Sequence, residues 1–163
     1  MKTKDIRINK ELILKYNPCP KGVDNFNKHY TDISIKTLIN SSNISYGDKI
    51  WLLKQIVPKE LMVLWSIDSA FAAYEYSPNV IYRYSCDFAF NASNDATFAD
   101  YAANNIVIPT DDTPMNVAGY AISAANYAVD AAKCAVDAAD FYDKDNAKNE
   151  RLQALLYLIE NEG

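Results

Sequence analysis

Two aspartates stand in surroundings that could give a carboxyl group acid–base chemistry. Asp68 lies within the apolar stretch LMVLWSIDSAFAAY, and Asp87 lies among aromatic residues. Apolar surroundings raise the pKa of a carboxyl group, as a general acid or base near neutral pH requires. Either aspartate also suits a structural role, as the cap of a neighbouring helix or the partner of a lysine. We expect the structural role, and an enzyme that uses Asp68 or Asp87 is the third of our hypotheses.

Other patterns typical of catalysis or metal binding do not occur in the sequence. His29 is the only histidine, and no cysteine or carboxylate lies at metal-ligand spacing on its predicted helix. The three cysteines, Cys19, Cys86 and Cys134, are too widely spaced for a CxxC metal site and are typical of reduced, buried thiols. The four glycines are too far apart for a phosphate-binding loop. The sequence therefore predicts a protein that is not an enzyme and uses no metal or cofactor.

Three aspartates of an Ala-rich segment could instead contact a binding partner. They are Asp130, Asp137 and Asp140. A shared metal ion explains them less well, because Asp130 and Asp137 are two helical turns apart and Asp140 lacks a further ligand. We interpret them as solvent-facing carboxylates that are available to a basic protein surface.

Six aromatic residues lie on either side of a predicted helix break at Ser77-Pro78. They are Tyr74, Tyr76, Tyr82, Tyr84, Phe88 and Phe90. Tyrosine combines an apolar ring with a polar hydroxyl, so the four tyrosines could line a pocket for a nucleotide base or anchor a protein interface. Core packing across the break explains the same cluster, and both interpretations stay open.

An Ala-rich heptad repeat over residues 118–141 must position the acidic residues. It reads AGYAISA, ANYAVDA and AKCAVDA, with alanine in three columns. The polar positions alternate between spacings of four and three residues and so form one narrow stripe along a helix. They are Gly119, Ser123, Asn126, Asp130, Lys133, Asp137, Asp140 and Lys144. Because every other position is small or apolar, we predict a central helix that is surrounded by protein on most sides.

Start and stop signals predict further helices along the chain. Asn9 caps a first helix that ends before Asn17-Pro18. Later helix starts are expected at Pro20, at Asp32 or Ser34, at Ser45 or Gly47, at Pro58 and at Asn94 or Asp95. A break over residues 143–146 precedes a Leu-rich final helix over residues 147–160. Residues 79–91 fit a strand or a helix, and we expect a helix because a lone strand has no partner.

Together these signals predict a single all-α domain over residues 1–163. It is expected to be a bundle of about seven or eight helices around the Ala-rich helix. Residues 1–76 hold the N-terminal helices, residues 77–110 an irregular or helical middle, and residues 111–163 the Ala-rich and C-terminal helices. The length and the small number of glycines, 4 in 163 residues, fit such a domain.

Charge is divided unevenly along the chain. Residues 1–86 carry 12 Lys or Arg and 8 Asp or Glu, a net charge of +4, whereas residues 87–163 carry 4 and 13, a net charge of −9. The acidic second half argues against direct nucleic-acid binding and permits basic protein partners or simple solubility. The N-terminus has no apolar signal core, and no apolar run approaches the roughly 18 residues of a membrane span. We therefore expect a cytoplasmic protein without a membrane partner.

The segment KELILKYNPCPKGVDNFNKHY resembles the opening of a family of small bacterial and phage proteins. The residues that carry the resemblance are Tyr16, Asn17, Pro18, Cys19, Gly22, Phe26 and Tyr30. The segments KIWLLKQIV, LMVLWSIDSAFAAYEY and LQALLYLIE are similar to later helices of that Ala-rich family, while residues 77–109 depart from its pattern. Family members are labelled immunity proteins or uncharacterised phage proteins. The resemblance implies neutralisation of a target by binding, and it assigns no functional residue.

These observations support two main hypotheses on function. The first is a phage-associated inhibitor or immunity protein in the bacterial cytoplasm, which contacts a host defence or rival protein through Asp130, Asp137 and Asp140. The alternative is a module that sequesters a small signalling ligand, such as a nucleotide, among the four tyrosines.

Overall fold

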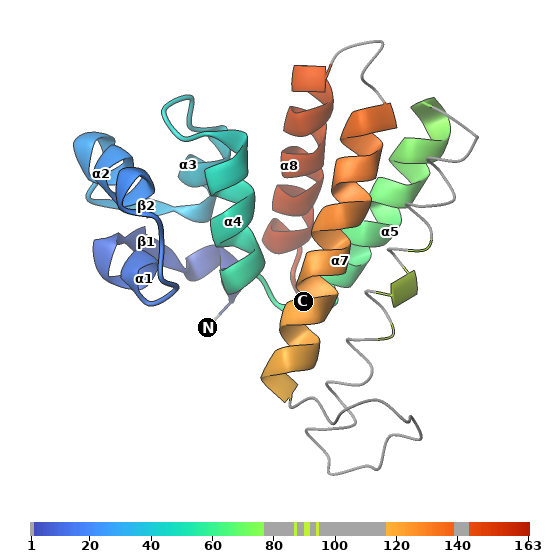
Figure 1. Ribbon diagram of the computed structural model, residues 1–163, viewed down its shortest axis with the longest axis horizontal. Coiled ribbons are helices and arrows are strands. Elements are labelled where there is room, and N and C mark those ends of the chain that lie inside the picture. Colours follow the sequence, from blue (N-terminus) through green and yellow to red (C-terminus); the bar gives the residue numbers. More distant parts are fainter. Residues whose placement is uncertain (1, 77–86, 88–89, 92–93, 95–116, 139–143) are drawn as a thin grey trace.

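The computed structural model describes residues 2–76, 87, 90–91, 94, 117–138 and 144–163. Within these residues, seven α-helices and a single two-stranded sheet form an all-α fold, as predicted (Figure 1). The helices are α1 (Lys10–Leu14), α2 (Pro20–His29), α3 (Ile35–Asn40), α4 (Tyr46–Ile56), α5 (Lys59–Tyr76), α7 (Val117–Ala138) and α8 (Lys144–Glu160). A 3-10 turn, η1 (Thr3–Asp5), precedes the first strand. Most residues of the segments 79–91 and 94–105 lie outside the description, and the described ones among them, residues 87, 90–91 and 94, are helical.

Side-chain caps start the short helices of the N-terminal part. Asn9, Ser34 and Ser45 each accept a hydrogen bond from the backbone N–H three residues further on, at 2.9, 3.1 and 3.1 Å. These bonds satisfy N–H groups that have no partner within the helix. The structure confirms the cap predicted at Asn9, and it selects Ser34 over Asp32 and Ser45 over Gly47.

An antiparallel pair of strands was not expected from the sequence. Strand β1 (Arg7–Asn9) pairs with β2 (Asp32–Ser34), and Ile8 lies opposite Ile33 with both side chains buried. Each strand has only three residues, which is too short to show an alternating pattern. The two segments are also far apart in the sequence, so that only the packing of α1 and α2 brings them together.

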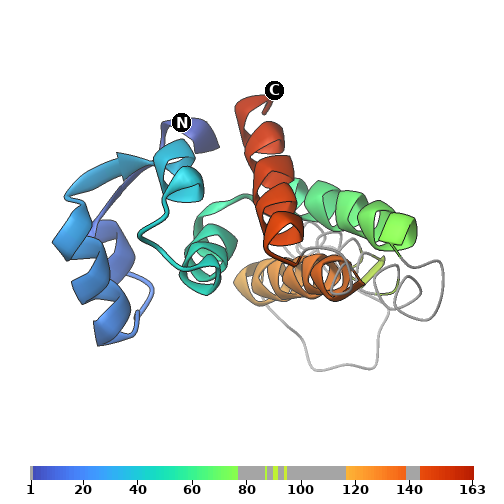
Figure 2. The same cartoon turned by 90° about the horizontal axis from the view of Figure 1, so that it is seen from above.

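Four longer helices form the other part of the fold. Helix α7 contacts α4, α5 and α8, and Figures 1 and 2 show it between α4 and α5 with α8 across one side. All alanines of α7 whose side chains are described are buried: Ala124, Ala125, Ala128, Ala131, Ala132 and Ala135. Ala135 packs against Ala72 and Ala73 of α5, where small side chains let the two helices approach closely. This packing agrees with the central position predicted for the Ala-rich helix.

Helix α8 begins earlier than expected. The sequence predicted a break over residues 143–146, but Lys144 is already helical. Asp145 lies in the first helical turn, where a carboxylate interacts favourably with the helix dipole, and it also pairs with Lys148 at 3.1 Å. Asn146 donates to the Glu150 carboxylate at 2.9 Å. Polar side chains that looked like a break therefore stabilise the first turn of a helix.

Helix α8 also connects the two parts of the molecule. Its end reaches the N-terminal segment, where the backbone N–H of Thr3 donates to Glu162 Oε2 at 2.6 Å and Lys36 pairs with Glu160 at 2.9 Å. Buried side chains from β1 to α8 form one main hydrophobic cluster. In the described segments, no helix is both long and apolar enough to cross a membrane.

Candidate functional site

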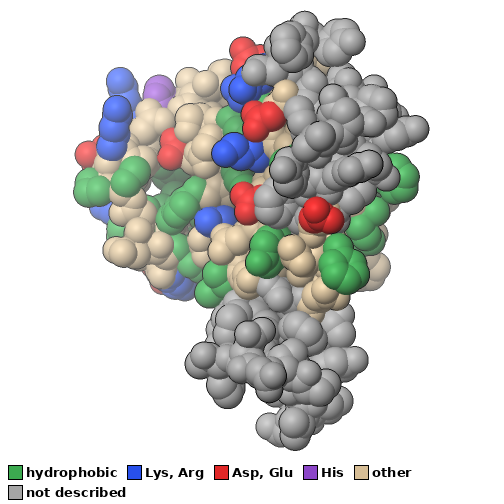
Figure 3. Space-filling model, turned by 45° about the vertical axis from the view of Figure 1, so that its right-hand side comes forward, with side chains coloured by type: hydrophobic (Ala, Val, Ile, Leu, Met, Phe, Trp, Pro, Cys, Tyr) green, Lys and Arg blue, Asp and Glu red, His purple; other side chains and the backbone are tan. Residues whose placement is uncertain are grey.

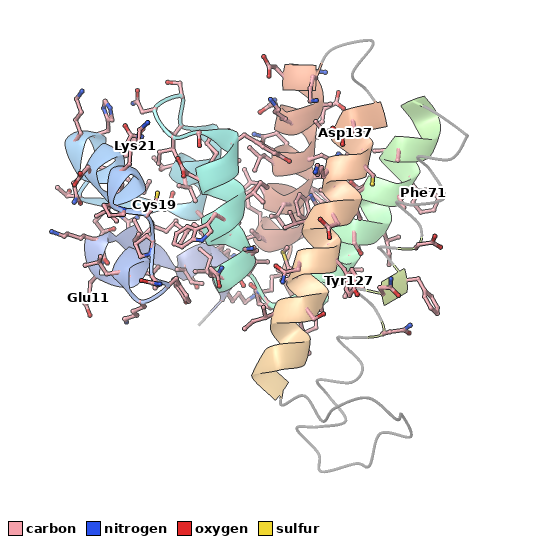
Figure 4. The ribbon with its side chains drawn as sticks, viewed as in Figure 1. Glu11, Cys19, Lys21, Phe71, Tyr127 and Asp137 are labelled. Atoms are coloured by element: carbon pink, nitrogen blue, oxygen red, sulfur yellow. The ribbon has the colours of Figure 1, made fainter. Side chains whose placement is uncertain are left out.

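The polar stripe predicted along α7 is the accessible side of this helix. Asn126 and Lys133 are exposed, and Ser123, Asp130 and Asp137 are half-buried, whereas the neighbouring alanines are buried. Figure 4 shows Asp137 near the C-terminal end of α7. The third predicted contact, Asp140, lies outside the described residues. We refer to Asp130 and Asp137 together as the acidic pair.

Only one member of the acidic pair has a cationic partner in the described structure. Lys144 Nζ lies 3.5 Å from Asp137 Oδ1, and Asp130 forms neither an ion pair nor a hydrogen bond with any described residue. Burial raises the pKa of the Cys134 thiol, and the charges of Asp137 and Asp130 raise it further, while Lys133 lowers it. The two carboxylates of the acidic pair therefore produce a negative potential around Cys134 on α7.

Both candidate catalytic aspartates are exposed. Asp68 Oδ2 lies 2.5 Å from Arg151 Nη1, and about half of the Asp68 side chain is exposed. Asp87 is open to solvent. Neither aspartate lines the cavity described below. The geometry therefore gives no support to acid–base chemistry at these positions.

The predicted tyrosine pocket cannot be located in the described structure. Tyr74 and Tyr76 lie in the last turns of α5, but their side chains are outside the described part, as are residues Tyr82 and Tyr84. The pocket stays a prediction.

His29 ends α2 with an exposed side chain, and its ring centroid lies 6.2 Å from that of Tyr30. Among the described residues, no three His, Cys, Asp or Glu side chains are grouped so that they could hold a metal ion.

A row of large apolar side chains on α5 is exposed. Leu64, Ile67 and Phe71 are 49%, 42% and 68% exposed. They follow one another at helical spacing and face away from Trp65, which is fully buried. Figure 3 shows hydrophobic side chains at the surface on this side of the molecule. The i, i+3, i+7 spacing of these residues is visible in the sequence. Because apolar residues occur on all sides of α5, however, the sequence does not indicate which side of the helix is exposed.

A cavity of about 230 Å³ lies among the N-terminal helices. Its wall is mainly apolar and includes Ile13, Phe26, Leu38, Ile44, Trp51 and Leu52. Three further lining residues carry polar atoms: Cys19, Asn25 and Asp48. The sequence does not predict this cavity, although Pro18, Cys19, Gly22 and Phe26 belong to the motif that carries the family resemblance. It needs four helices to close it, so spacing along the chain does not reveal it.

Cys19 lines the cavity from the start of α2. It is the N-cap of α2, and its Sγ accepts a hydrogen bond from the Gly22 N–H at 3.3 Å. The side chain is exposed, which corrects the expectation of a buried thiol, since a cap must face the open end of its helix. Figure 4 shows Cys19 between α1 and α2. Cys134 is half-buried, and Cys86 lies outside the described residues.

Comparison of the chain with family models, with curated proteins and with solved structures found no match.

Proposed function

We propose that this protein is a small binding protein, of the inhibitor or immunity type, that covers a basic surface of a target protein. The observation that carries the proposal is the accessible polar side of α7. This helix is buried along its alanines, yet it presents Asp130 without a described partner on its open side. A carboxylate held on a rigid, central helix is positioned for an ion pair across an interface.

Neighbouring features of α7 fit a protein interface better than a solvated surface. Ile122 is 59% exposed and lies one turn before Asn126 in the stripe. Protein interfaces commonly combine an apolar anchor with charged residues at the rim. The net charge of −9 over residues 87–163 favours a basic partner and would accelerate its association.

The biological setting of the proposal comes from the family resemblance. We propose a phage-associated protein in the bacterial cytoplasm whose target is a host defence or rival protein. The proposal includes no catalytic step, and the ion pair of Asp68 with Arg151 and the exposure of Asp87 support binding over catalysis.

A charge-reversal pair of variants tests the acidic pair. Asp130→Lys with Asp137→Lys is expected to abolish partner binding and to leave the fold intact, because both side chains are accessible. The matched control is Glu11→Lys with Asp24→Lys, which makes the same charge change at exposed positions of α1 and α2. Each protein is immobilised, exposed to bacterial lysate and washed at increasing salt, and the retained proteins are quantified by mass spectrometry.

We expect a saturable partner that the wild type and the control retain. The variant with Asp130→Lys and Asp137→Lys should lose this partner. Salt should release this partner, because accessible ion pairs are screened. If no saturable partner is recovered with the wild type, the proposal is wrong. Equal retention by both variants would move the interface away from α7.

A further inference from the structure

We propose that the cavity among α1, α2, α3 and α4 is a binding site for a small organic cation, an aryl- or alkylammonium compound. This inference is independent of the proposed function, because no described residue of α7 lines the cavity. It rests on the size of the cavity, its apolar wall and one carboxylate oxygen.

The volume sets the size of the ligand. About 230 Å³ lies below the roughly 300 Å³ at which typical drug-sized pockets begin and above the roughly 150 Å³ that accommodates a benzene ring. The cavity therefore fits a compact molecule of roughly ten non-hydrogen atoms.

The wall sets the chemistry of the ligand body. The rings of Phe26 and Trp51 and the branched side chains of Ile13 and Ile44 line the cavity. Such a lining favours an aromatic or branched aliphatic group, because burial of apolar surface drives its transfer from water.

Asp48 sets the charge of the ligand head. Its Oδ2 accepts a hydrogen bond from Ser45 Oγ at 2.7 Å, and no described residue donates a hydrogen bond to its Oδ1. No described lysine or arginine forms an ion pair with Asp48. Asn25 uses its amide N–H₂ to bond the Asn43 carbonyl at 2.8 Å. The cavity thus offers a partly buried, unpaired carboxylate oxygen, which favours an ammonium group.

Gly22 keeps the space beside Asp48 open. A Cβ at this position would lie 3.2 Å from Cys19 Sγ and 3.7 Å from Asp48 Oδ1. A side chain at residue 22 would therefore occupy the region where the ammonium group would meet the carboxylate. The nearby Cys19 thiol is exposed, so that it can report on occupancy of the site.

The experiment compares three probes of nearly equal shape: 2-phenylethylamine, neutral 2-phenylethanol and anionic 3-phenylpropionate. Binding is measured by titration calorimetry and by protection of Cys19 from iodoacetamide, read peptide by peptide in a mass spectrometer. Cys134 is the internal reference, because it lies on α7. We expect the amine to bind about tenfold more tightly than the alcohol, the anion to bind most weakly, and the amine alone to protect Cys19 fully.

Two variants and one control variant locate the effect at the cavity. Asp48→Asn preserves the shape and is expected to remove the preference for the amine over the alcohol. Asp24→Asn makes the same charge change at an exposed position of α2 outside the cavity and is expected to keep that preference. Gly22→Ala keeps Asp48 but narrows the site, so it is expected to weaken amine binding even if Asp48→Asn does not fold.

Equal affinities for the three probes would overturn the proposal, as would an unchanged amine preference in Asp48→Asn. If Gly22→Ala did not weaken binding of the amine, this cavity would be excluded as the binding site. The charge-reversed α7 variant should still bind the amine, so that failure here and failure of the proposed function remain distinguishable.

Discussion

Arg151 and Asp68 illustrate how single residues hold the helices together. The Arg151 side chain is largely buried and donates to Asp68 on α5, while its backbone carbonyl accepts the Trp65 indole N–H at 2.8 Å. The two contacts fasten α8 to α5 at neighbouring positions. Asp68, which stood out in the sequence as a carboxylate in apolar company, is thus the partner of a buried cation.

Tyr46 is expected to make stability depend on alkaline pH. Burial raises the pKa of its hydroxyl to about 12 from 10.0, although Arg151 opposes the shift. The unfolded chain therefore loses this proton first, and the stability that Tyr46 contributes is complete below pH 10 and is lost as pH rises through about 12. Tyr46→Phe removes the effect, so near pH 11 the wild type should lose about 1 kcal/mol relative to the variant.

Urea unfolding of both proteins, at neutral pH and near pH 11, measures this difference. Tyr157→Phe is the control, because Tyr157 is exposed on α8. If the free energies of unfolding of wild type and Tyr46→Phe changed in parallel with pH, the assignment to Tyr46 would be wrong.

Helix α7 shows what small side chains do at the scale of an element. Its buried alanines contribute little apolar area each, but they allow α5 and α8 to pack closely, and alanine has the highest helix propensity. The outer face of α5 is the opposite case. Leu64, Ile67 and Phe71 offer large apolar area without a described neighbour that covers it, which is typical of an interaction surface.

Larger side chains at the buried alanines are expected to overpack α7. Ala128→Leu and Ala131→Leu, at two fully buried positions, should each destabilise the protein by about 1–3 kcal/mol. Lys133→Leu is the matched control, because it adds leucine to the same helix at an exposed position. Thermal unfolding of the three variants measures the effect, and unchanged stability of both alanine variants would contradict a buried central helix.

At the scale of the whole molecule, the N-terminal elements and the long helices share one hydrophobic cluster. That cluster contains Ile8 of β1, Trp65 of α5 and Leu155 of α8. Polar contacts of the C-terminal end with Thr3 and Lys36 join the same two parts.

We therefore expect cooperative unfolding in one transition. A core shared by both parts loses packing on both sides when either part unfolds. Denaturant unfolding is followed by tryptophan fluorescence, which reports on Trp51 of α4 and Trp65 of α5, and by far-ultraviolet circular dichroism, which reports on all helices. The two midpoints should coincide. Two separated midpoints would indicate that the parts unfold independently.

The helices and the buried side of α7 could be predicted because their signals are local. The capping role of Asn9 depends on the backbone three residues away, and the buried alanines repeat within two turns of one helix. The pairing of β1 with β2 and the cavity beside Asp48 could not be predicted, since each joins segments that are distant in the sequence.

The sequence by itself determined the all-α class, the helix cap at Asn9 and the burial of the α7 alanines, because periodicity and capping act within a few residues. Only the tertiary structure decided that Asp68 pairs with Arg151, that Leu64 lies outside the core and that Gly22 opens a cavity toward Asp48. These outcomes depend on how helices dock against one another. A helix that is apolar nearly all round, as α5 is, does not specify which face its neighbours will cover.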